Sequence, residues 1–264
     1  MTTVSVPVTL ESRPDGVSPG SAAADVLALA EQGLDTLVAR ARSASTAEVE
    51  LALNRPHRSL DDFATLLSPA AAERLEDLAG AAHQTTVRRF GRVVRLFAPL
   101  YLSNECVSSC TYCGFSAEND VVRRTLSAAE AVREAQALHA TGFRHLLLVS
   151  GEHARIVSKD YLVEAVRALA PVMPSISVEV QAWDAATYRR LVEAGCEGLV
   201  VYQETYDRAT YAASHVKGKK RNYDWRLAAP DRGAEAGMRR LGVGALLGLH
   251  DDWRADALMV AAHA

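Results

Sequence analysis

Three of the four cysteines of this chain lie in one short segment, NECVSSCTYCGFS, at residues 104–116. Cys106, Cys110 and Cys113 follow one another with the spacing CxxxCxxC. Thiolates are soft ligands that suit zinc, copper(I) and iron–sulfur clusters. Three thiolates on a four-iron cluster leave one iron open, whereas a structural zinc site takes four protein ligands, usually as two spaced pairs. The ligand count therefore favours a catalytic 4Fe-4S cluster.

The alternative is a structural zinc site that a distant histidine completes. His139, His145 and His153 are the candidates for that fourth ligand. The remaining cysteine, Cys196, precedes a predicted strand and so falls at the opposite end of the strands from the cluster. We expect it to be an inert thiol in the hydrophobic core.

Charge and composition exclude several classes of protein. The chain has 264 residues with 29 basic and 32 acidic side chains and a net charge of −3, so no overall field favours nucleic acid or an anionic membrane. It has no apolar run of about 18 residues, and its N-terminus lacks the basic start and apolar core of a secretory signal. We expect a cytoplasmic protein whose clustered cysteines bind a metal or act in catalysis rather than form disulfides.

Strand-length apolar runs alternate with amphipathic helices from about residue 93 onward. The expected strands are 93–102, 145–150, 175–181, 198–204 and 243–249. This alternation predicts an α/β fold with a parallel sheet. A complete barrel of the TIM type takes ~250 residues for eight units. The sequence therefore predicts an incomplete (β/α) barrel of about five of the eight units, either a truncated chain or an open partial barrel.

The chain divides into three predicted regions. Residues 1–20 are expected to be a disordered tail. Residues 21–92 read as an N-terminal helical extension, and residues 93–264 as the barrel. Barrel enzymes build their active sites at the carboxyl ends of the strands, and the cysteine segment directly follows the first predicted strand. Its position therefore supports a catalytic role.

Polar residues and one glycine also occur near the carboxyl ends of the later strands. They are Gly151 with Glu152, Gln181, Gln203 with Glu204, and Tyr206. Glu179 precedes Gln181 by two residues and so shares its inward face. A buried glutamate needs a partner or a proton, and Arg226 is one candidate partner. The basic run HVKGKKR at 215–221 is either a solvated loop or a segment that grips carboxylates.

A series of motifs in the order of these strands resembles the radical S-adenosylmethionine (SAM) superfamily. The motifs are APLYLSNECVSSCTYCGFS, GFRHLLLVSGEH, VYQETY, ATYAASHVKGKK, WRLAAPDR and GALLGLHDDWR. Within the superfamily they resemble the 2-iminoacetate synthases, the tyrosine lyases of thiamine biosynthesis. The likeness covers most of residues 95–264, whereas the N-terminal helices resemble the family only weakly.

The resemblance implies a role for each site residue. Cys106, Cys110 and Cys113 would hold the 4Fe-4S cluster. Tyr112 would lie against the adenine of SAM, and Gly151 and Glu152 would bind its methionine amino group. Glu179, Gln181, Gln203 and Arg226 would contribute further cofactor contacts. Glu204 and Tyr206 would act on the substrate.

The resemblance also implies a reaction and partners. SAM cleavage would supply a 5′-deoxyadenosyl radical, which would break the Cα–Cβ bond of L-tyrosine to give p-cresol and 2-iminoacetate. A thiazole synthase would receive the imine, and a flavodoxin or ferredoxin-type protein would donate electrons. Neither nucleic acid nor membrane is an expected partner. Two related functions remain open, hydrogenase maturation and deazaflavin formation, as does an inactive fragment that only binds a cluster or zinc.

Overall fold

The structure is a computed structural model that describes residues 17–264. Of the predicted disordered tail, residues 1–16 lie outside the described residues. None of the helices in the described part of the chain is both long enough and apolar enough to cross a lipid bilayer.

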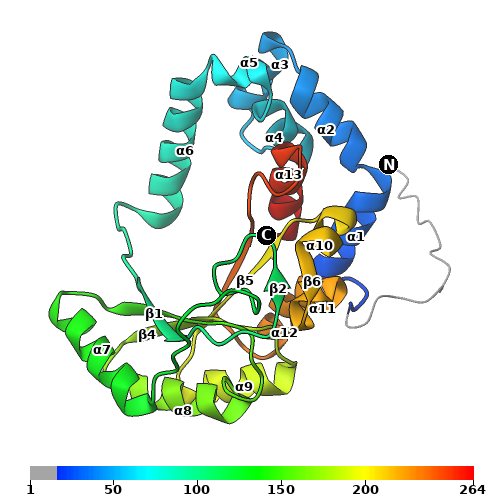
Figure 1. The fold of residues 1–264 in the computed structure, drawn as a ribbon. Coiled ribbons are helices and arrows are strands. Elements are labelled where there is room, and N and C mark those ends of the chain that lie inside the picture. Colours follow the sequence, from blue (N-terminus) through cyan, green and yellow to red (C-terminus); the bar gives the residue numbers. More distant parts are fainter. Residues whose placement is uncertain (1–16) are drawn as a thin grey trace.

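Five parallel strands form the central sheet, in the order β1, β3, β4, β5 and β7 (Figure 1). Their bounds are β1 (Ala98–Ser103), β3 (His145–Ser150), β4 (Ser175–Glu179), β5 (Gly198–Glu204) and β7 (Arg240–Ala245). Each strand pairs in parallel with its neighbour in this order. The predicted parallel α/β fold of five strand–helix units is therefore confirmed. Within residues 17–264 the sheet does not close into a barrel, and β1 and β7 form its edges.

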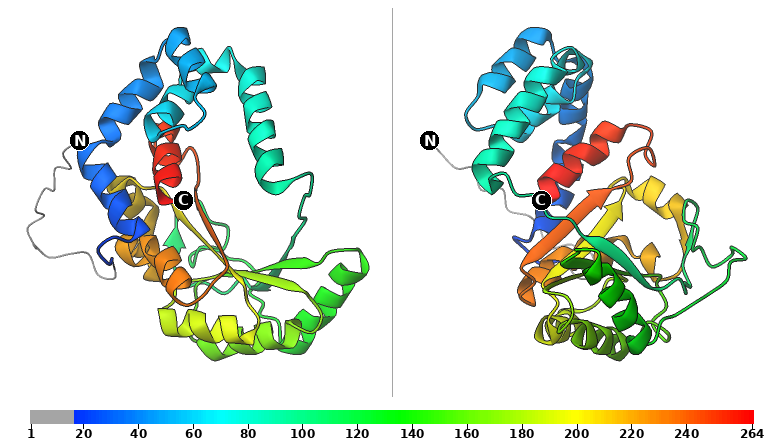
Figure 2. Two further views of the ribbon diagram at one scale, coloured as in Figure 1. Left: turned by 180° about the vertical axis from the view of Figure 1, so that it is seen from behind. Right: turned by 90° about the vertical axis from the view of Figure 1, so that its left-hand side faces the viewer.

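Helices cover one face of this sheet and bury the main core. They are α7 (Ala128–Ala140), α8 (Lys159–Leu169), α9 (Ala185–Ala194) and α12 (Ala229–Glu235). Leu146 and Leu148 of β3 are buried in this core, and the alternation of side chains along a strand turns Leu147 between them to the other face. Figures 1 and 2 agree that α7, α8 and α9 lie along the same side of the sheet. Because all five strands are parallel, their carboxyl ends share one edge of the sheet.

Helices also fill the region from residue 22 to residue 90. They are α1 (Ala22–Gln32), α2 (Leu34–Ser43), α3 (Thr46–Asn54), α4 (Leu60–Leu66), α5 (Pro69–Ala72) and α6 (Leu75–Phe90). Ala23 and Val26 of α1 are buried with Met259 of α13 (Trp253–His263), so this region shares a core with the last helix of the chain. Helix α6 stands apart and leads to β1 (Figure 1), and it has no buried residue.

Three short helical elements lie between β5 and α12. They are α10 (Arg208–Ser214), the 3-10 helix η1 (Lys219–Arg221) and α11 (Tyr223–Leu227). A second small sheet pairs β2 (Ser109–Cys110) with β6 (His215–Lys217). Both elements of that pair lie beside the carboxyl edge of the large sheet, where the sequence places its candidate site.

Three predicted strands have the wrong bounds. The third in chain order ends at Glu179 rather than at residue 181, because its ladder with β3 stops at Glu179. The first begins at Ala98 rather than at residue 93, because the ladder with β3 starts at Ala98 and Leu146 and residues 93–97 have no strand to pair with. The last strand is 240–245 rather than 243–249. Gly237 has a φ of 94°, which ends α12 early and lets the strand begin at Arg240.

Candidate active site

The cysteine loop, defined as residues 104–116, leaves the carboxyl end of β1 and carries the three clustered cysteines. Its strand β2 lies beside β6 (Figure 1) and pairs antiparallel with it. In this pairing Cys110 lies opposite His215. The amide of Thr111 also donates to the carbonyl of Ser214 at 3.0 Å. We call residues 215–221 the brace, because this segment holds the cysteine loop from the side.

The three clustered cysteines are free thiols that differ in burial. Cys110 is buried, whereas Cys106 and Cys113 are half-buried. The amide of Phe115 donates to Sγ of Cys113 at 3.4 Å. Burial raises the pKa of the Cys110 thiol to about 11. A metal that displaces its proton would therefore be needed to hold Cys110 as a thiolate at neutral pH.

Gly151 brings the end of β3 into direct contact with the cysteine loop. A Cβ atom at Gly151 would lie 2.3 Å from the carbonyl oxygen of Glu105 and 3.1 Å from Cβ of Cys106. The next residue fixes the same approach, since the carbonyl of Glu152 accepts a 2.9 Å hydrogen bond from the amide of Val107. Only glycine fits at position 151, because the backbone at Gly151 packs directly against the backbone at Glu105.

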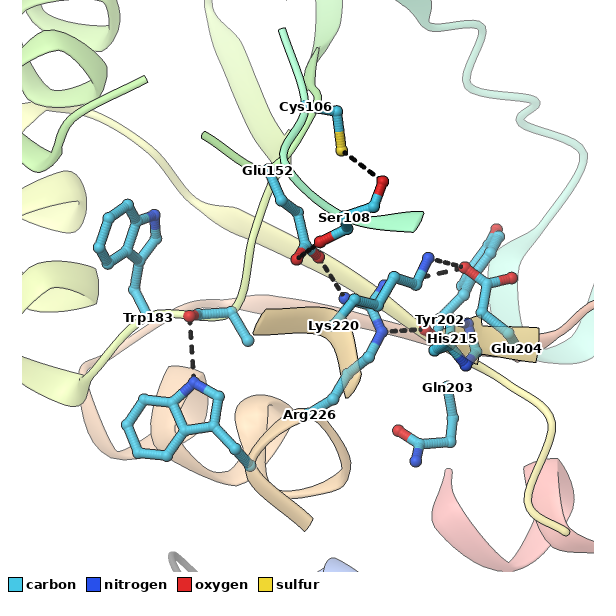
Figure 3. A network of polar contacts seen from close by, with 12 residues as sticks. Cys106, Ser108, Glu152, Trp183, Tyr202, Gln203, Glu204, His215, Lys220 and Arg226 are labelled. Carbon is cyan, nitrogen blue, oxygen red and sulfur yellow. Dashed lines mark hydrogen bonds and ion pairs between the residues drawn. The ribbon is translucent and has the colours of Figure 1, made fainter. Parts of the chain in front are cut away.

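Glu152 and Arg226 form a buried ion pair at the centre of the site (Figure 3). Nη1 of Arg226 lies 3.1 Å from Oε1 of Glu152, and Oγ of Ser108 donates to the other carboxylate oxygen at 3.3 Å. Nε of Arg226 donates to the carbonyl of Tyr202 at 2.7 Å, which fixes the guanidinium against β5. Glu152 thus faces the cysteine loop from β3, and Arg226 faces it from α11.

Arg226, one candidate partner for Glu179 in the sequence, does not form an ion pair with it. Arg226 pairs with Glu152 and lies 3.8 Å from Glu204, because its Nε is held at Tyr202. Glu179 has no ion-pair partner within residues 17–264. Burial, and secondarily the charge of Glu204, raises the pKa of the Glu179 carboxyl. Glu179 therefore meets the need of a buried glutamate by favouring its protonated form.

Glu204 occupies a strained backbone position at the end of β5. Its φ of 74° makes it the only residue other than glycine with a positive φ in the described part of the chain. The ladder with β7 shifts register between Tyr202 and Glu204, which marks a β-bulge. Bulges re-aim side chains, and strain of this kind collects at functional sites. Here it turns the Glu204 carboxylate toward Lys220 of the brace, at 2.7 Å (Figure 3).

Tyr112 of the cysteine loop contacts the brace through two side chains. Nδ1 of His215 lies 2.8 Å from the carbonyl of Tyr211 and must donate to it, which leaves Nε2 to accept the Tyr112 hydroxyl at 2.7 Å. Burial, together with the charge of Lys220, lowers the pKa of His215 to about 4, so the ring is neutral. Nζ of Lys220 lies 5.6 Å from the centroid of the Tyr112 ring.

Gln181 and Gln203 are both buried, and each keeps a polar atom without a partner. Gln181 lies just beyond β4 with its Nε2 unpaired, and Gln203 lies in β5 with its Oε1 unpaired. Nε2 of Gln203 makes a long hydrogen bond of 3.4 Å to the carbonyl of Tyr223. Buried amides rarely remain unsatisfied in a folded protein. These two atoms are therefore candidates for hydrogen bonds to a bound group.

Tyr206 does not join the other predicted site residues. The sequence places it at the cavity, but its hydroxyl contacts Nδ1 of His263 at 2.8 Å and its amide donates to Asp256 at 2.7 Å. Both partners belong to α13, and the ring is buried in the same cluster as Ala23 of α1. The chain leaves the sheet after Glu204, so Tyr206 turns toward the N-terminal helices instead of the cysteine loop.

Cys196 lies where the sequence places it. It is 2% exposed in the main core, just before β5 and thus at the amino edge of the sheet. Burial raises the pKa of its thiol to about 12. The predicted position of Cys196, in the core and at the opposite edge of the sheet from the cysteine loop, is confirmed.

Sequence reasoning missed three residues of the site. His215 and Lys220 belong to the run HVKGKKR, whose sequence fits both a solvated loop and a segment that binds carboxylates. The structure divides the run between the two, because Lys220 binds Glu204 whereas Lys217 and Lys219 are exposed. The third residue, Ser108, gave no signal, since a serine between two cysteines shows no pattern of its own.

The donor set fits an iron–sulfur cluster better than a single metal ion. No group of three or more His, Cys, Asp or Glu side chains within residues 17–264 is arranged to hold one ion. The zinc alternative with a distant histidine therefore gains no support. A cluster takes one thiolate per iron and needs no common point between the thiolates, and all three free thiols come from one loop.

Comparison with known proteins places the chain in a family. Residues 100–260 match the radical SAM superfamily. The chain belongs to that superfamily. It is 47% identical over 229 residues to a 2-iminoacetate synthase of Escherichia coli (strain K12), with 87% of this chain and 61% of that protein covered. It is also 32% identical over 180 residues to a 3-methylornithine synthase of Methanosarcina acetivorans, covering 66% of this chain and 50% of that protein.

Solved structures of the superfamily share the fold. A crystal structure of HydG, a maturase of FeFe-hydrogenase, aligns with a TM-score of 0.82 at 29% identity, covering 89% of this chain and 54% of that one. Methylornithine synthase aligns with a TM-score of 0.68 at 26% identity, covering 80% of this chain and 62% of that one. The chain thus spans about 61% of the length of the 2-iminoacetate synthase that it matches.

Membership of the superfamily identifies the cofactors as a 4Fe-4S cluster and SAM. The residues present fit both groups. The cysteine loop offers three free thiols, Gly151 lets the end of β3 pack directly on that loop, and Gln181 and Gln203 keep unpaired polar atoms. Glu152 and Arg226 supply one charge of each sign beside the thiols.

Proposed function

We propose that this chain provides the cluster-binding and SAM-binding part of a lyase that cleaves L-tyrosine to 2-iminoacetate and p-cresol for thiazole formation in thiamine biosynthesis. The observation that carries this proposal is the convergence of the cysteine loop, Glu152, Arg226 and Glu204 at one edge of the sheet. Identity of 47% to a 2-iminoacetate synthase supports the choice of reaction. SAM bound at the reduced cluster supplies a 5′-deoxyadenosyl radical, the chemistry common to the superfamily.

The Glu152–Arg226 pair is suited to an α-amino acid. Such a group carries an ammonium and a carboxylate, so it can replace one buried ion pair with two. The ammonium would take Glu152, and the carboxylate would take Arg226, which is already fixed by the carbonyl of Tyr202. The methionine end of SAM has this chemistry. We assign Glu152 and Arg226 to that end, and Gln181 and Gln203 to the remaining polar groups of the cofactor.

Glu204 is the residue that we assign to the substrate. Its strained backbone and its ion pair with Lys220 fix the carboxylate between the brace and Arg226. Burial raises the pKa of the Glu179 carboxyl, and the nearby charge of Glu204 raises it further, so Glu179 can hold a proton beside that carboxylate. Tyr112 stands beside the cysteines and is assigned to the adenine. We leave Tyr206 out, because its side chain is committed to His263.

The partners follow from the reaction proposed. L-tyrosine is the substrate, a thiazole synthase takes up the product, and a flavodoxin or ferredoxin-type protein donates electrons in the cytoplasm. Hydrogenase maturation is the second candidate, because HydG shares the fold at a TM-score of 0.82. Identity of 29% to HydG against 47% to the 2-iminoacetate synthase favours the first function.

Substitution of Glu152 tests the assignment of the cofactor site. We expect Glu152→Gln to weaken SAM binding by about 1.5–3 kcal/mol, the range for a hydrogen bond to a charged group. Titration of SAM into the reconstituted and reduced protein, followed by the EPR signal of the reduced cluster, gives the affinity. Glu197→Gln is the matched control, since Glu197 also pairs with an arginine, Arg240 at 2.6 Å, but at the amino edge of the sheet. Equal affinity in both variants would remove Glu152 from the SAM site.

Product analysis tests the reaction. The chain alone, and the chain joined to the part of the Escherichia coli relative that it does not match, are each incubated with dithionite, SAM and L-tyrosine. We expect p-cresol that depends on both SAM and tyrosine, with more from the joined protein because it supplies the length that a whole TIM-type barrel takes. SAM cleavage without p-cresol in both proteins would reject the tyrosine lyase and leave the other radical SAM functions.

A further inference from the structure

The outward side of the brace is a basic surface without partners of its own. Lys217, Lys219 and Arg221 are all exposed, and none of them forms an ion pair within residues 17–264. Val216 between them is 57% exposed. Glu118 is the nearby acidic residue, and its pKa is lowered first by the hydrogen bond from Ser109, then by that from Ser116 and by the charge of Lys217. Ser109 and Ser116 both donate to its carboxylate. We call Lys217, Lys219 and Arg221 the basic face.

A groove of about 640 Å³ opens beside the basic face. Its lining residues are Lys159, Ala182, Trp183, Asp184, Gly218, Lys219, Arg221, Asn222 and Trp225. Asp184 is the acid among them, and it is paired with Lys159 at 2.5 Å. Nζ of Lys159 and Nζ of Lys219 lie 5.4 Å and 5.8 Å from the centroid of the Trp183 ring. The groove therefore offers positive charge above an aromatic floor.

The basic face lies directly behind the cysteine loop. Lys217 is the register partner of Ser109, one residue from Cys110. A Cβ atom at Gly218 would lie 2.3 Å from Oγ of Ser108, so the two backbones touch there. A protein seated on this face would be separated from the cysteines by little more than the pair of strands β2 and β6.

Charge selects the kind of partner. The chain as a whole has a net charge of only −3, so the molecule as a whole does not attract an acidic protein, whereas the three cations of the basic face, which are unpaired within residues 17–264, do. Such a contrast steers encounter and orientation more than it adds affinity. Radical SAM chemistry requires that the cluster receives electrons singly from outside. A docking face one strand away from the cysteines meets that requirement.

We propose that the basic face and its groove dock an acidic electron-carrying protein, which passes one electron to the cluster held by the cysteine loop. The donor is oxidised by one electron and the cluster is reduced by one, with no bond made or broken. This inference rests on the proposed function, because it assumes a cluster that must be reduced. The brace then has two sides, with His215 and Lys220 directed at the site and the basic face directed at the donor.

The test uses the full chain with its cluster reconstituted anaerobically. Photoreduced flavodoxin is the probe, because it is an acidic protein whose colour changes as it gives up an electron. Stopped-flow absorbance compares the wild type with the triple variant Lys217→Glu, Lys219→Glu, Arg221→Glu. The matched control is Arg88→Glu, Arg89→Glu, Arg92→Glu, which changes the net charge equally at three exposed residues near the end of α6. Dithionite, a small reductant that needs no docking, is used in parallel.

We expect the rate of reduction by flavodoxin at low salt to fall about 10- to 100-fold in the basic-face variant. It should change less than threefold in the control, and reduction by dithionite and SAM cleavage should be the same in all three proteins. An equal loss in the control, or an unchanged rate in the basic-face variant, would overturn the docking proposal and leave the proposed function intact.

Two further outcomes would also overturn the docking proposal. A single-stranded DNA oligomer of the same charge as flavodoxin can be added as a competitor, and so can oxidised flavodoxin. If the DNA slows reduction by photoreduced flavodoxin as strongly as oxidised flavodoxin does, the face binds anions in general and not a redox protein. If the wild type takes no electron from dithionite and cleaves no SAM, the proposed function fails and the docking proposal fails with it.

Discussion

The cysteine loop and the brace pack against each other, but the sequence predicts the role of the cysteine loop and not that of the brace. The cysteine loop has a spacing, CxxxCxxC, that metal chemistry explains without any knowledge of the fold. The brace has a run of basic residues whose roles depend on which side each one faces. His215 and Lys220 face the site, whereas Lys217 and Lys219 face outward. Ligand sets can thus be predicted from spacing, but the segments that position them cannot.

The largest expected effect is on the cysteine loop itself. Cys106→Ala, Cys110→Ala and Cys113→Ala should each remove most of the iron and sulfide that the wild type binds, about four of each per chain for a cluster of this type. Cys196→Ala is the control, because its thiol is buried in the core at the opposite edge of the sheet. Colorimetric iron and sulfide analysis after anaerobic reconstitution makes the measurement. Full loading in any of the first three variants would refute that ligand.

The next effect separates two neighbouring lysines of the brace. Lys220→Met removes the partner of a largely buried carboxylate, Glu204, and leaves Arg226 at 3.8 Å as partial compensation. We expect a loss of about 2–4 kcal/mol in the free energy of unfolding, somewhat less than for a buried pair with no other partner. Lys219→Met, which changes an exposed lysine, should lie within about 0.5 kcal/mol of the wild type. Urea unfolding of the iron-free protein compares the two, and equal losses would contradict the division of the brace into two sides.

Gly218 tests the contact between the two segments. Gly218 and Gly91 have similar backbone angles, with φ of 89° and 68° and ψ of −174° and −152°, respectively. A Cβ atom at Gly91 meets nothing within 4 Å, whereas one at Gly218 meets Ser108. We therefore expect Gly218→Ala to cost about 1–3 kcal/mol more in unfolding free energy than Gly91→Ala, the range for overpacking. Comparable costs would mean that the brace does not press on the cysteine loop.

A smaller effect concerns pH. The pKa of His215 is about 4 in the folded protein, below its ordinary value of 6.5, because the ring is buried near Lys220 and Arg226 with Glu204 as the opposing charge. As the pH falls, the unfolded chain protonates His215 before the folded protein does. The contribution of the neutral ring to the free energy of unfolding is therefore fully present above pH 6.5 and is lost toward pH 4. Between pH 6.5 and pH 5, the free energy of unfolding of the iron-free wild type should fall by about 1.5 kcal/mol more than that of the His215→Gln variant. The exposed His83→Gln variant should follow the wild type in thermal unfolding, and a His215→Gln curve that matches both would reject a buried neutral ring.

The sequence predicts the fold better than it predicts the site. Alternating apolar runs predict five parallel strands, and two of the predicted strands, 145–150 and 198–204, have the observed bounds. The edge strands were misplaced because their ends depend on pairing with β3 and β5, which no local pattern records. In the site, the position of each residue at a strand end is predictable, but its direction is not. The bulge at Glu204 turns Tyr206 toward α13. The hydrogen bond from Arg226 to the carbonyl of Tyr202 places the guanidinium beside Glu152 instead of Glu179.

The EPR spectrum of the reduced protein, recorded with and without SAM, tests the central claim most directly. That claim is that the cysteine loop, held by the brace, presents a 4Fe-4S cluster with one iron open to SAM. We predict the signal of a reduced four-iron cluster that changes shape when SAM is added, both in the wild type and in the Lys219→Met variant. In Gly218→Ala the signal or its response to SAM should be lost or strongly reduced. A wild-type signal that SAM leaves unaltered, or an undiminished response in Gly218→Ala, would contradict the account.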